Sequence, residues 1–524
     1  MTDRIDSITS TVSQTPQQRQ PRHGRPSTAS KISIASAKLS MVSFEPTQAD
    51  ETPWPSIYVM SALAMCQAIQ FSLYFTPMWP YLNYLDKEAT VLFFGLTVSA
   101  YSFGHLVSAP FFDKWRQDSK ALRPILLVCL VLMFIGHALY FMAGAFKEDA
   151  KWAILVSRAV VGTGESSLTI FQSYAASSSL PKDRPKAIAI STTSLAFGAF
   201  VGPALQLIFW FLAEDGIAIT ENVRLNMYTG APLLCCLINI VGIFLVLFVF
   251  EECYVDRMHS EMLKENEFIA LPYDRWACVV CLFTRFAQLF AFTNLETVGT
   301  VFLMVMFAFN RVQSVFTMLV AQLLMGLLTF TIHNMYTFFD IEKWINLRQI
   351  CLSAVSGLLL FYLATYTWPF FPGKISFYSS NASLHTFMGN TTQAGCDTDV
   401  YGWCEIVTPI NFWLYIICFA VLFGVCMPNM NLALGTLFLR ILGNTNDAQP
   451  QSWFLLSGSA GRIVGPILLS RLYTMFGPQM AWLLEMIVLI VALILWFVFY
   501  TRMIPARVFK RPTFKMANFK ITEE

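Results

Sequence analysis

Charged residues inside long apolar segments are the side chains of this chain best placed to do chemistry. An ionisable group costs several kcal/mol in a membrane-spanning helix unless it is paired or hydrated, so each is a hypothesis for a functional residue. Arg158 and Glu165 are seven residues apart, which places them on one face of a helix, about 10 Å apart along its axis. Arg285, Glu296 and Arg462 stand in other apolar segments. We predict that these five residues bind a substrate or a coupling ion.

Structural roles for the same charged residues are equally compatible with the sequence. A structural pair with a carboxylate or with carbonyl groups explains Arg158 and Arg462 equally well. Glu296 lies close to Asn294 and Thr297, which fits the wall of a polar cavity for a solute or a proton, and Glu165 is a candidate proton carrier. Arg471 and Glu485, nearer the ends of their segments, are expected to pair or to reach the membrane surface. Three histidines are either structural or pH-sensitive: His105, His137 and His333.

The composition indicates what must hold these residues in place. Hydrophobic residues make up 56% of the 524-residue chain and charged residues 13%, with a mean hydropathy of +0.55, whereas about 25% of the residues of a soluble domain are charged. Apolar segments of about 20 residues are long enough to cross a bilayer. They predict twelve transmembrane helices, at 56–80, 90–112, 125–145, 152–176, 186–212, 229–250, 276–307, 312–336, 349–371, 409–433, 453–476 and 480–502.

The polar segments divide the chain into parts. Lys and Arg are frequent after the second and fourth helices and at the C-terminus, and sparse in the opposite loops, which predicts that both tails are cytosolic. The expected parts are a disordered N-tail (1–53), a six-helix bundle (54–250), a cytosolic linker (251–275), a second six-helix bundle (276–502) with a lumenal loop (372–408), and a cytosolic C-tail (503–524).

The loop 372–408 carries signs of an oxidising compartment. Asn381 and Asn390 each begin an N-x-S/T sequon, and Cys396 and Cys404 lie in the same polar segment. Sequons and closely spaced cysteines are typical of a lumenal or extracellular face. We therefore predict glycosylation at both asparagines and a disulfide between the two cysteines, on the side of the membrane that the Lys and Arg bias also gives to this loop.

A short motif occurs twice, at equivalent places in the two bundles. The fifth and eleventh helices both contain G-x-x-x-G-P, and the two copies are 263 positions apart, half of the chain. Small residues one turn apart allow close helix packing, and proline bends a helix. Two repeated six-helix units predict an all-α membrane fold of two pseudo-symmetric halves with a solute site at the midplane between them. The residues assigned to packing are Gly198, Gly202, Pro203, Gly461, Gly465 and Pro466.

Several classes of function lack their motifs in this sequence. There is no G-x-x-x-x-G-K-[ST] motif for ATP binding, no hydrolytic signature and no TVGYG-type filter. Cys278 and Cys281 form a C-x-x-C without a second pair at metal spacing. We therefore expect no enzyme activity, catalytic residue, cofactor, metal or nucleic-acid partner. The expected protein is a monomer in a lipid bilayer, and it uses the gradient of a solute or an ion such as chloride or protons.

At these residues the chain resembles the major facilitator superfamily. The fourth helix carries R-x-x-x-G-x-G at Arg158, Gly162 and Gly164, and the fifth carries G-x-x-x-G-P. The segment after the second helix resembles the cytosolic gating motif of that superfamily through Asp113 and Arg116, with an alanine where glycine is usual. The resemblance implies the two-bundle fold and transport by rocking of the halves.

A narrower resemblance, to an endolysosomal branch of that superfamily, extends over residues 54–500. It implies a lysosomal or endosomal membrane and a role in anion permeation, notably of chloride. Glu165 stands where we expect a small residue in that branch, and the N-tail contains no clear acidic dileucine sorting signal. The segments that carry the resemblance are Met78–Leu82, Leu225–Thr229, Leu295–Thr297, the loop from Cys396 through Cys404 to Pro409, and Ser457–Pro466.

Three functions follow from these observations. The first is a secondary transporter that moves a small anionic solute by alternating access. The second is a channel-like chloride conductance through the same bundle, which intramembrane arginines permit. The third is a receptor or scaffold that transports nothing. The retained charges disfavour the third, because unused charges in a membrane are costly.

Overall fold

The computed structural model describes residues 47–49, 51–119, 121–180, 182–220, 223–255, 268–270, 273–339, 345–379, 395–443, 449–504 and 508–510. The two predicted glycosylation sites, Asn381 and Asn390, lie outside these residues. So do most of the N-tail, the middle of the linker and most of the C-tail.

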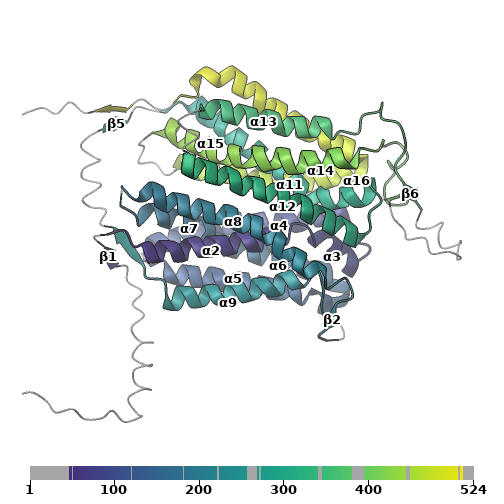
Figure 1. Ribbon diagram of the computed structural model, residues 1–524, viewed down its shortest axis with the longest axis horizontal. Helices are drawn as coiled ribbons and strands as arrows, with labels where there is room; N and C mark the ends of the chain where they lie inside the picture. Colours follow the sequence, from purple (N-terminus) through teal and green to yellow (C-terminus); the bar gives the residue numbers. More distant parts are fainter. Residues whose placement is uncertain are drawn as a thin grey trace, which may run out of the picture. The chain divides into compact units, whose positions relative to one another are not determined.

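The described residues are mainly long helices that lie side by side (Figure 1). Those of the first half are α2 (Trp54–Leu73), α3 (Met78–Leu85), α4 (Val91–Ser119), α5 (Arg123–Phe141), the 3-10 helix η1 (Ala143–Asp149), α6 (Ala150–Glu165), α7 (Ser167–Ser177), α8 (Arg184–Trp210) and α9 (Gly230–Phe248). Those of the second half are α11 (Arg275–Met306), α12 (Arg311–Phe339), α13 (Leu347–Ala364), α14 (Phe412–Cys418), the π-helix η4 (Phe419–Phe423), α15 (Gly424–Leu442), α16 (Gln449–Phe499) and the 3-10 helix η5 (Tyr500–Arg502).

The predicted all-α fold with twelve transmembrane helices is confirmed. Among the described residues, ten helices are long and apolar enough to cross a membrane. The last of these covers 51 residues but contains Gly477, whose φ of 79° is readily adopted only by glycine, so it comprises two spans. α6 and α7 are separated only at Ser166 and together form one more span.

Three predicted helices are interrupted, which the apolar pattern did not indicate. The first span breaks into a turn at residues 74–77 before α3 begins, where Pro77 lacks the N–H that helix bonding needs. The fourth helix breaks at Ser166. The tenth contains the π-helix η4, a feature often found at functional sites. α13 ends at Ala364, earlier than the predicted 371, shortly before Pro369.

The two G-x-x-x-G-P motifs make equivalent contacts inside their own halves. In each half, the motif helix packs so closely on the first helix of that half that a Cβ on either glycine would overlap it. The two overlapped residues are seven positions apart in both halves: Gly198 meets Met65 and Gly202 meets Ser72, whereas Gly461 meets Phe286 and Gly465 meets Thr293. The repeat seen in the sequence is thus a repeat in packing between α2 and α8 and between α11 and α16.

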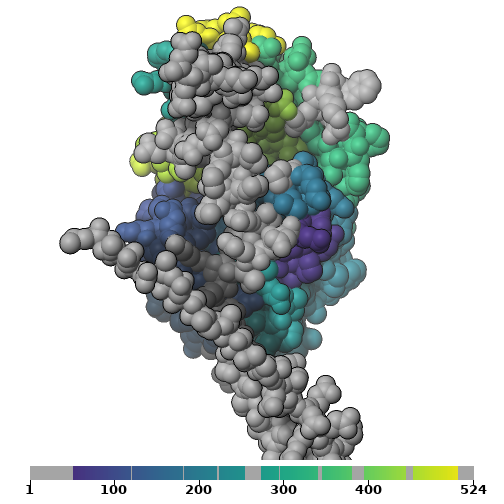
Figure 2. Space-filling view, turned by 90° about the vertical axis from the view of Figure 1, so that its left-hand side faces the viewer, coloured from purple at the N-terminus to yellow at the C-terminus, as the bar shows by residue number. Residues whose placement is uncertain are grey.

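The halves meet along two further helix pairs, α4 with α16 and α8 with α12. Ser99 of α4 donates a hydrogen bond to the carbonyl oxygen of Ile463 at 2.8 Å. Thr76 donates to Gln322 Oε1 of α12 at 2.7 Å. In the view along the helices in Figure 2, the purple and blue residues of the first half lie below the green and yellow residues of the second.

Short strands pair at both ends of the bundle. We call the end that carries Trp54 and Arg502 the tail side, at the left of Figure 1, and the end that carries Asp86 and Lys374 the loop side. On the tail side, strands near both termini pair with the two ends of the linker. The pairs are β1 (Thr47–Ala49) with β4 (Cys253–Val255) and β5 (Phe268–Ala270) with β8 (Val508–Lys510); on the loop side they are β2 (Ile217–Ala218) with β3 (Arg224–Leu225) and β6 (Phe377–Tyr378) with β7 (Cys396–Asp397).

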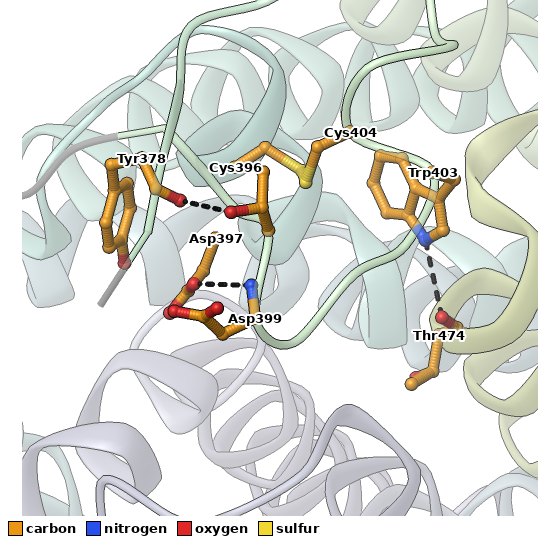
Figure 3. Close-up of a disulfide and its surroundings, with 8 residues drawn as sticks. Tyr378, Cys396, Asp397, Asp399, Trp403, Cys404 and Thr474 are labelled. Carbon is orange, nitrogen blue, oxygen red and sulfur yellow. Dashed lines mark hydrogen bonds between the residues drawn. A yellow bond between two sulfur atoms is a disulfide. The ribbon is translucent and has the colours of Figure 1, made fainter. Parts of the chain in front are cut away.

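A disulfide fastens the long loop between α13 and α14 (Figure 3). It joins Cys396 and Cys404, whose Cα atoms are 5.7 Å apart and whose side chains are buried. Trp403, next to the disulfide, donates from Nε1 to the carbonyl oxygen of Thr474 at 3.3 Å. A Cβ on Gly477 would lie 2.8 Å from the Trp403 ring. The loop is therefore seated against the turn between the last two spans.

Candidate functional site

Arg158 is buried between two aromatic rings at the centre of the first half. It is 1% exposed, and its guanidinium carbon lies 4.8 Å from the ring centroid of Tyr74 and 4.5 Å from that of Tyr101. A cation over an aromatic face gains about 0.5–2 kcal/mol. Within the described residues, Arg158 forms no ion pair and its Nε has no hydrogen-bond partner. Tyr74 stands where the first span breaks, so the break presents its ring to Arg158.

Arg462 reaches the same aromatic group from the second half. Its guanidinium carbon lies 5.0 Å from the ring centroid of Phe71 and 5.5 Å from that of Tyr101. The Tyr101 ring therefore contacts two cations, one from each half. Among the described side chains, Arg462 also has no ion pair, and its Nε is buried without a hydrogen-bond partner.

Glycines of α6 explain how Arg158 comes to this position. A Cβ on Gly162 would overlap the carbonyl oxygen of Tyr101, and one on Gly164 would lie 2.6 Å from the carbonyl oxygen of Cys129. α6 therefore packs tightly against both α4 and α5. Arg158 precedes Gly162 by one turn, so the close approach at Gly162 sets the arginine against the Tyr101 ring.

Two buried carboxyl groups complete the cluster. Glu165 is 7% and Glu296 is 3% exposed. The Glu165 carboxyl interacts with the side chains of Tyr101 and Gln67, and the charge of each arginine, Arg158 and Arg462, acts on both carboxyl groups. Glu296 Oε2 has no hydrogen-bond partner in the described part of the chain. The central cluster, defined as Arg158, Glu165, Glu296 and Arg462, thus holds both signs of charge without a direct ion pair among its described atoms.

The structure places Arg285 apart from the aromatic rings that Arg158 and Arg462 contact, so its predicted role in binding a substrate or a coupling ion stays a prediction. Its Nη1 donates to Asn431 Oδ1 at 2.6 Å and to Gln288 Oε1 at 2.9 Å, and its guanidinium lies 5.4 Å from the Phe454 ring centroid. These partners all belong to the second half, on the tail side. The orientation of α11 turns Arg285 toward α15, which its place in the sequence did not show.

The predicted gating residues form a surface contact. Arg116 Nη2 and Asp113 Oδ1 are 3.5 Å apart on α4, and their side chains are 39% and 54% exposed. An exposed ion pair of this kind contributes little to stability. Glu485, expected near a helix end, is instead completely buried, whereas Arg471 is exposed. Within the described ranges, no three His, Cys, Asp or Glu side chains gather as metal ligands would.

On the loop side, a polar contact joins the two halves. Arg311 Nη1 lies 3.9 Å from Glu214 Oε1, to which Tyr228 donates at 2.5 Å. The Arg311 guanidinium also lies 5.9 Å from the Tyr84 ring centroid. Beside this contact is a depression of about 420 Å³, lined by Tyr81, Tyr84, Asp215 and Arg224 among others.

A second loop-side pair fixes the end of the first span. Lys151 Nζ donates to Asp86 Oδ2 at 2.8 Å. This hydrogen bond, more than any other contact, holds the pKa of the Asp86 carboxyl below its usual value of 3.8. Asp86 therefore stays ionised in mildly acidic solution.

The aromatic residues of the site were missed in the sequence. Phe71, Tyr74 and Tyr101 stand in apolar segments that are rich in aromatic residues throughout, since Phe, Trp and Tyr form 15% of the chain. Nothing distinguishes the rings that contact an arginine from those that contact lipid. The one local signal is Pro77, three residues after Tyr74, which marks the break in the helix.

Comparisons with known proteins agree with this architecture. A family model described as Major Facilitator Superfamily matches residues 60–402. Major facilitator superfamily domain-containing protein 8 of Xenopus laevis is 28% identical over 483 residues, which cover 86% of this chain and 92% of that protein. This match confirms that the narrower resemblance seen in the sequence is a similarity to that protein.

Two solved structures show the same fold. The human organic anion transporter MFSD10 (TETRAN) has 16% identity and a TM-score of 0.51, over 84% of this chain and 98% of that chain. A D-xylose-proton symporter has 12% identity and a TM-score of 0.57, over 85% and 98%. Since the family model covers more than half of the sequence and the two halves repeat the same helix contacts, the chain belongs to the Major Facilitator Superfamily.

Proposed function

We propose that this protein is a secondary transporter that carries a small anionic solute across an endolysosomal membrane by alternating access. The observation that supports this most is the Tyr101 ring, which contacts Arg158 of one half and Arg462 of the other. Both arginines lack an ion pair within the described residues. An anion placed between them satisfies both cations and depends on both halves at once.

The balance of charge favours a solute that is bound and then released. Two cations attract an anion, while Glu165 and Glu296 limit how strongly it is held, because carboxylates repel it when they are ionised. The human protein whose fold is similar is an organic anion transporter by its description. The role of the carboxyl groups is to tune affinity or to carry a proton with the solute.

Movement of the halves about their interface gives access from each side in turn. The Arg311–Glu214 contact joins the halves on the loop side. The two G-x-x-x-G-P motifs hold helices of the same half together, whereas Gly95 of α4 meets Ser470 and Pro466 of α16 across the interface. The contacts inside each half favour its movement as a body. We place both tails in the cytosol and the disulfide-bonded loop in the lumen, in line with the positive-inside rule and the oxidising environment that a disulfide needs. The contact between the halves on the loop side favours a transporter over a continuously open chloride channel.

The test measures uptake of radioactive chloride and, in a second series, of lactate by liposomes that contain the purified full-length protein. We expect saturable uptake that Arg158→Gln and Arg462→Gln each reduce about 10- to 100-fold, because a hydrogen bond to a charged group contributes roughly 1.5–3 kcal/mol. Arg471→Gln is the matched control, since Arg471 lies in the same helix as Arg462 but is exposed. If neither Arg158→Gln nor Arg462→Gln changes the uptake, the proposal is contradicted. Uptake that does not saturate with anion concentration supports the channel instead.

A further inference from the structure

His137 lies behind the central cluster and touches it through one tyrosine. The residue belongs to α5 and is completely buried. Its Nδ1 is 2.7 Å from the hydroxyl oxygen of Tyr74, and the two rings stack with centroids 5.3 Å apart. The guanidinium of Arg158 lies over the same Tyr74 ring at 4.8 Å. One tyrosine therefore contacts both the histidine and a cation of the proposed anion site.

Two polar atoms at this position lack a hydrogen-bond partner in the described part of the chain. His137 Nε2 and the Tyr140 hydroxyl are buried, and neither has a hydrogen bond to any described residue. The Tyr140 ring stands edge-on to Tyr74, with centroids 4.9 Å apart. Buried polar atoms are nearly always bonded to protein or to water, so these two atoms have room in their bonding for a water molecule or a proton. A histidine in water takes up a proton near neutral pH, and burial beside a cation makes that uptake more costly.

Tyrosines connect this position to the loop side. The Tyr140 ring centroid lies 5.4 Å from that of Tyr81, and Tyr81 lies 5.6 Å from Tyr228. Tyr81 also lines the depression of about 420 Å³ beside the loop-side contact between the halves. A row of tyrosine side chains thus extends from that depression to His137. The row lies within the first half, apart from the interface where the anion is proposed to bind.

We propose that His137 is a proton-binding site that fills from the loop side and is coupled to anion binding at Arg158. A hydronium ion in the depression gives up a proton and is left as water, and the proton binds at His137 Nε2 while Nδ1–H donates to the Tyr74 hydroxyl oxygen. One O–H bond of hydronium breaks, one N–H bond forms, and the imidazole becomes an imidazolium. This step rests on the proposed anion site, because the coupling needs an anion at Arg158.

The coupling follows from the charges that face His137. The charge of Arg158 of α6 acts on His137, and the Tyr74 hydroxyl, before α3, lies against its Nδ1. The titratable groups next to that tyrosine are Tyr140 of α5 and Cys235 of α9. Only Arg158 is charged among these in its ordinary state at neutral pH. Imidazolium beside guanidinium places two like charges in a medium of low dielectric constant, which is costly. An anion on Arg158 cancels that repulsion, so the proton and the anion enter together.

The test is proton uptake by purified full-length protein in weakly buffered detergent solution, followed with a pH-indicator dye as sodium chloride or sodium lactate replaces sodium gluconate at constant ionic strength. Anion binding is measured separately as the rise in the apparent Tm. We expect wild-type protein to take up close to one proton as the anion binds, and the dissociation constant of the anion to rise by about tenfold per pH unit where His137 is deprotonated.

Three variants decide the outcome. In His137→Gln, and in Tyr140→Phe if the first does not fold, we expect the anion still to raise the apparent Tm at pH 8. We expect His137→Gln to abolish proton uptake and Tyr140→Phe to slow it. His333→Gln is the matched control and should behave as wild type, because the hydrogen bond that His333 forms among the described residues is a local one, from Nδ1 to the Thr329 carbonyl oxygen of its own helix.

The possible failures are distinguishable. Anion binding without proton uptake in wild type, or uptake that persists in His137→Gln with unchanged rate in Tyr140→Phe, overturns the proton site and leaves the anion site standing. If neither chloride nor lactate raises the apparent Tm of wild type, the proposed anion site itself fails, and the coupling fails with it.

Discussion

Replacing Gly461 by alanine tests whether the close helix approach in the second half positions Arg462. A Cβ on Gly461 would lie 2.6 Å from the carbonyl oxygen of Phe286, whereas ordinary contact begins near 3.4 Å. α16 must therefore move away from α11 by about 0.8 Å. Because the obstacle is backbone, no side-chain rotation relieves it. The same movement draws the neighbouring Arg462 away from the Tyr101 ring.

The expected change in the free energy of unfolding has two opposing parts. Overfilling a packed contact costs about 1–3 kcal/mol, and alanine regains about 1 kcal/mol in a helix relative to glycine. Gly435→Ala is the matched control, since nothing lies within 4 Å of a Cβ at that position of α15, and it should only gain. Gly465→Ala should fall between them, because its Cβ meets a side-chain hydroxyl, that of Thr293, at 2.6 Å.

The assay is thermal unfolding of the purified variants together with anion-dependent stabilisation. A chain of this length shifts its apparent Tm by about 1–2 °C per kcal/mol, so Gly461→Ala and Gly435→Ala should differ by about 3 °C. Gly461→Ala should also show weaker stabilisation by chloride or lactate, whereas Gly435→Ala should not. Equal apparent Tm values for the two variants would refute the close packing on which this reasoning rests.

Three further predictions concern the loop side. Cys396→Ser should lower the apparent Tm by several degrees in thermal unfolding, because closing a loop with a sequence separation of 8 restricts the unfolded chain by roughly 2–3 kcal/mol. Asp86→Asn should lower the apparent Tm at pH 7. The hydrogen bond from Lys151 lowers the pKa of Asp86 in the folded protein, so its stabilisation is fully present above the usual pKa of aspartate. The difference in apparent Tm between wild type and Asp86→Asn should therefore shrink as the pH falls through the lowered pKa of the folded state. Arg311→Gln should remove the ion pair with Glu214 and raise, by about fivefold at most, the maleimide labelling of a cysteine introduced beside it, because a partly exposed pair contributes up to about 1 kcal/mol.

Each of these predictions has a control and a contrary outcome. Cys418→Ser removes a cysteine that is not in a disulfide and should leave the apparent Tm unchanged; an equal effect of both serine variants counts against the loop disulfide. A stability difference for Asp86→Asn that grows toward low pH reverses the expected sign. Labelling that is the same in Arg311→Gln and wild type shows that the pair does not hold the loop side closed.

The two-bundle fold was predictable because its signals are local in the sequence. Apolar segments of membrane-spanning length need no knowledge of their neighbours, and the two copies of G-x-x-x-G-P lie half a chain apart. The motif also indicated close packing, but not its partners. Only the structure shows that Gly198 faces Met65 and Gly461 faces Phe286, because a glycine has no side chain whose chemistry selects a partner.

The candidate site was predictable only in its charges. Arg158, Glu165, Glu296 and Arg462 stand out against apolar neighbours because charge is costly in a membrane. Arg285 stands out in the same way, yet it bonds Asn431 outside the cluster, because the rotation of a helix decides which way a charge points.

The aromatic rings and the helix breaks depend on three-dimensional arrangement. Tyr74 and Tyr101 become functional candidates only when a guanidinium is seen over their faces. The interruption at Ser166 comes two residues after Gly164, a glycine predicted from the sequence to serve in helix packing and not to mark a break. A sequence pattern shows which charged residues are energetically costly in a membrane. Their contacts with aromatic residues depend on the packing of several helices and cannot be seen in the pattern.

The glycine contacts have a consequence for how the polypeptide could be divided. α8 closes on α2 and α16 closes on α11, and each terminal strand pairs with the linker end that belongs to the same half, β1 with β4 and β5 with β8. The peptide bonds of the linker are then not what holds either half together. Two separately translated fragments, cut near residue 260, should find each other in the bilayer, and a gene with the halves in reverse order should encode the same assembly.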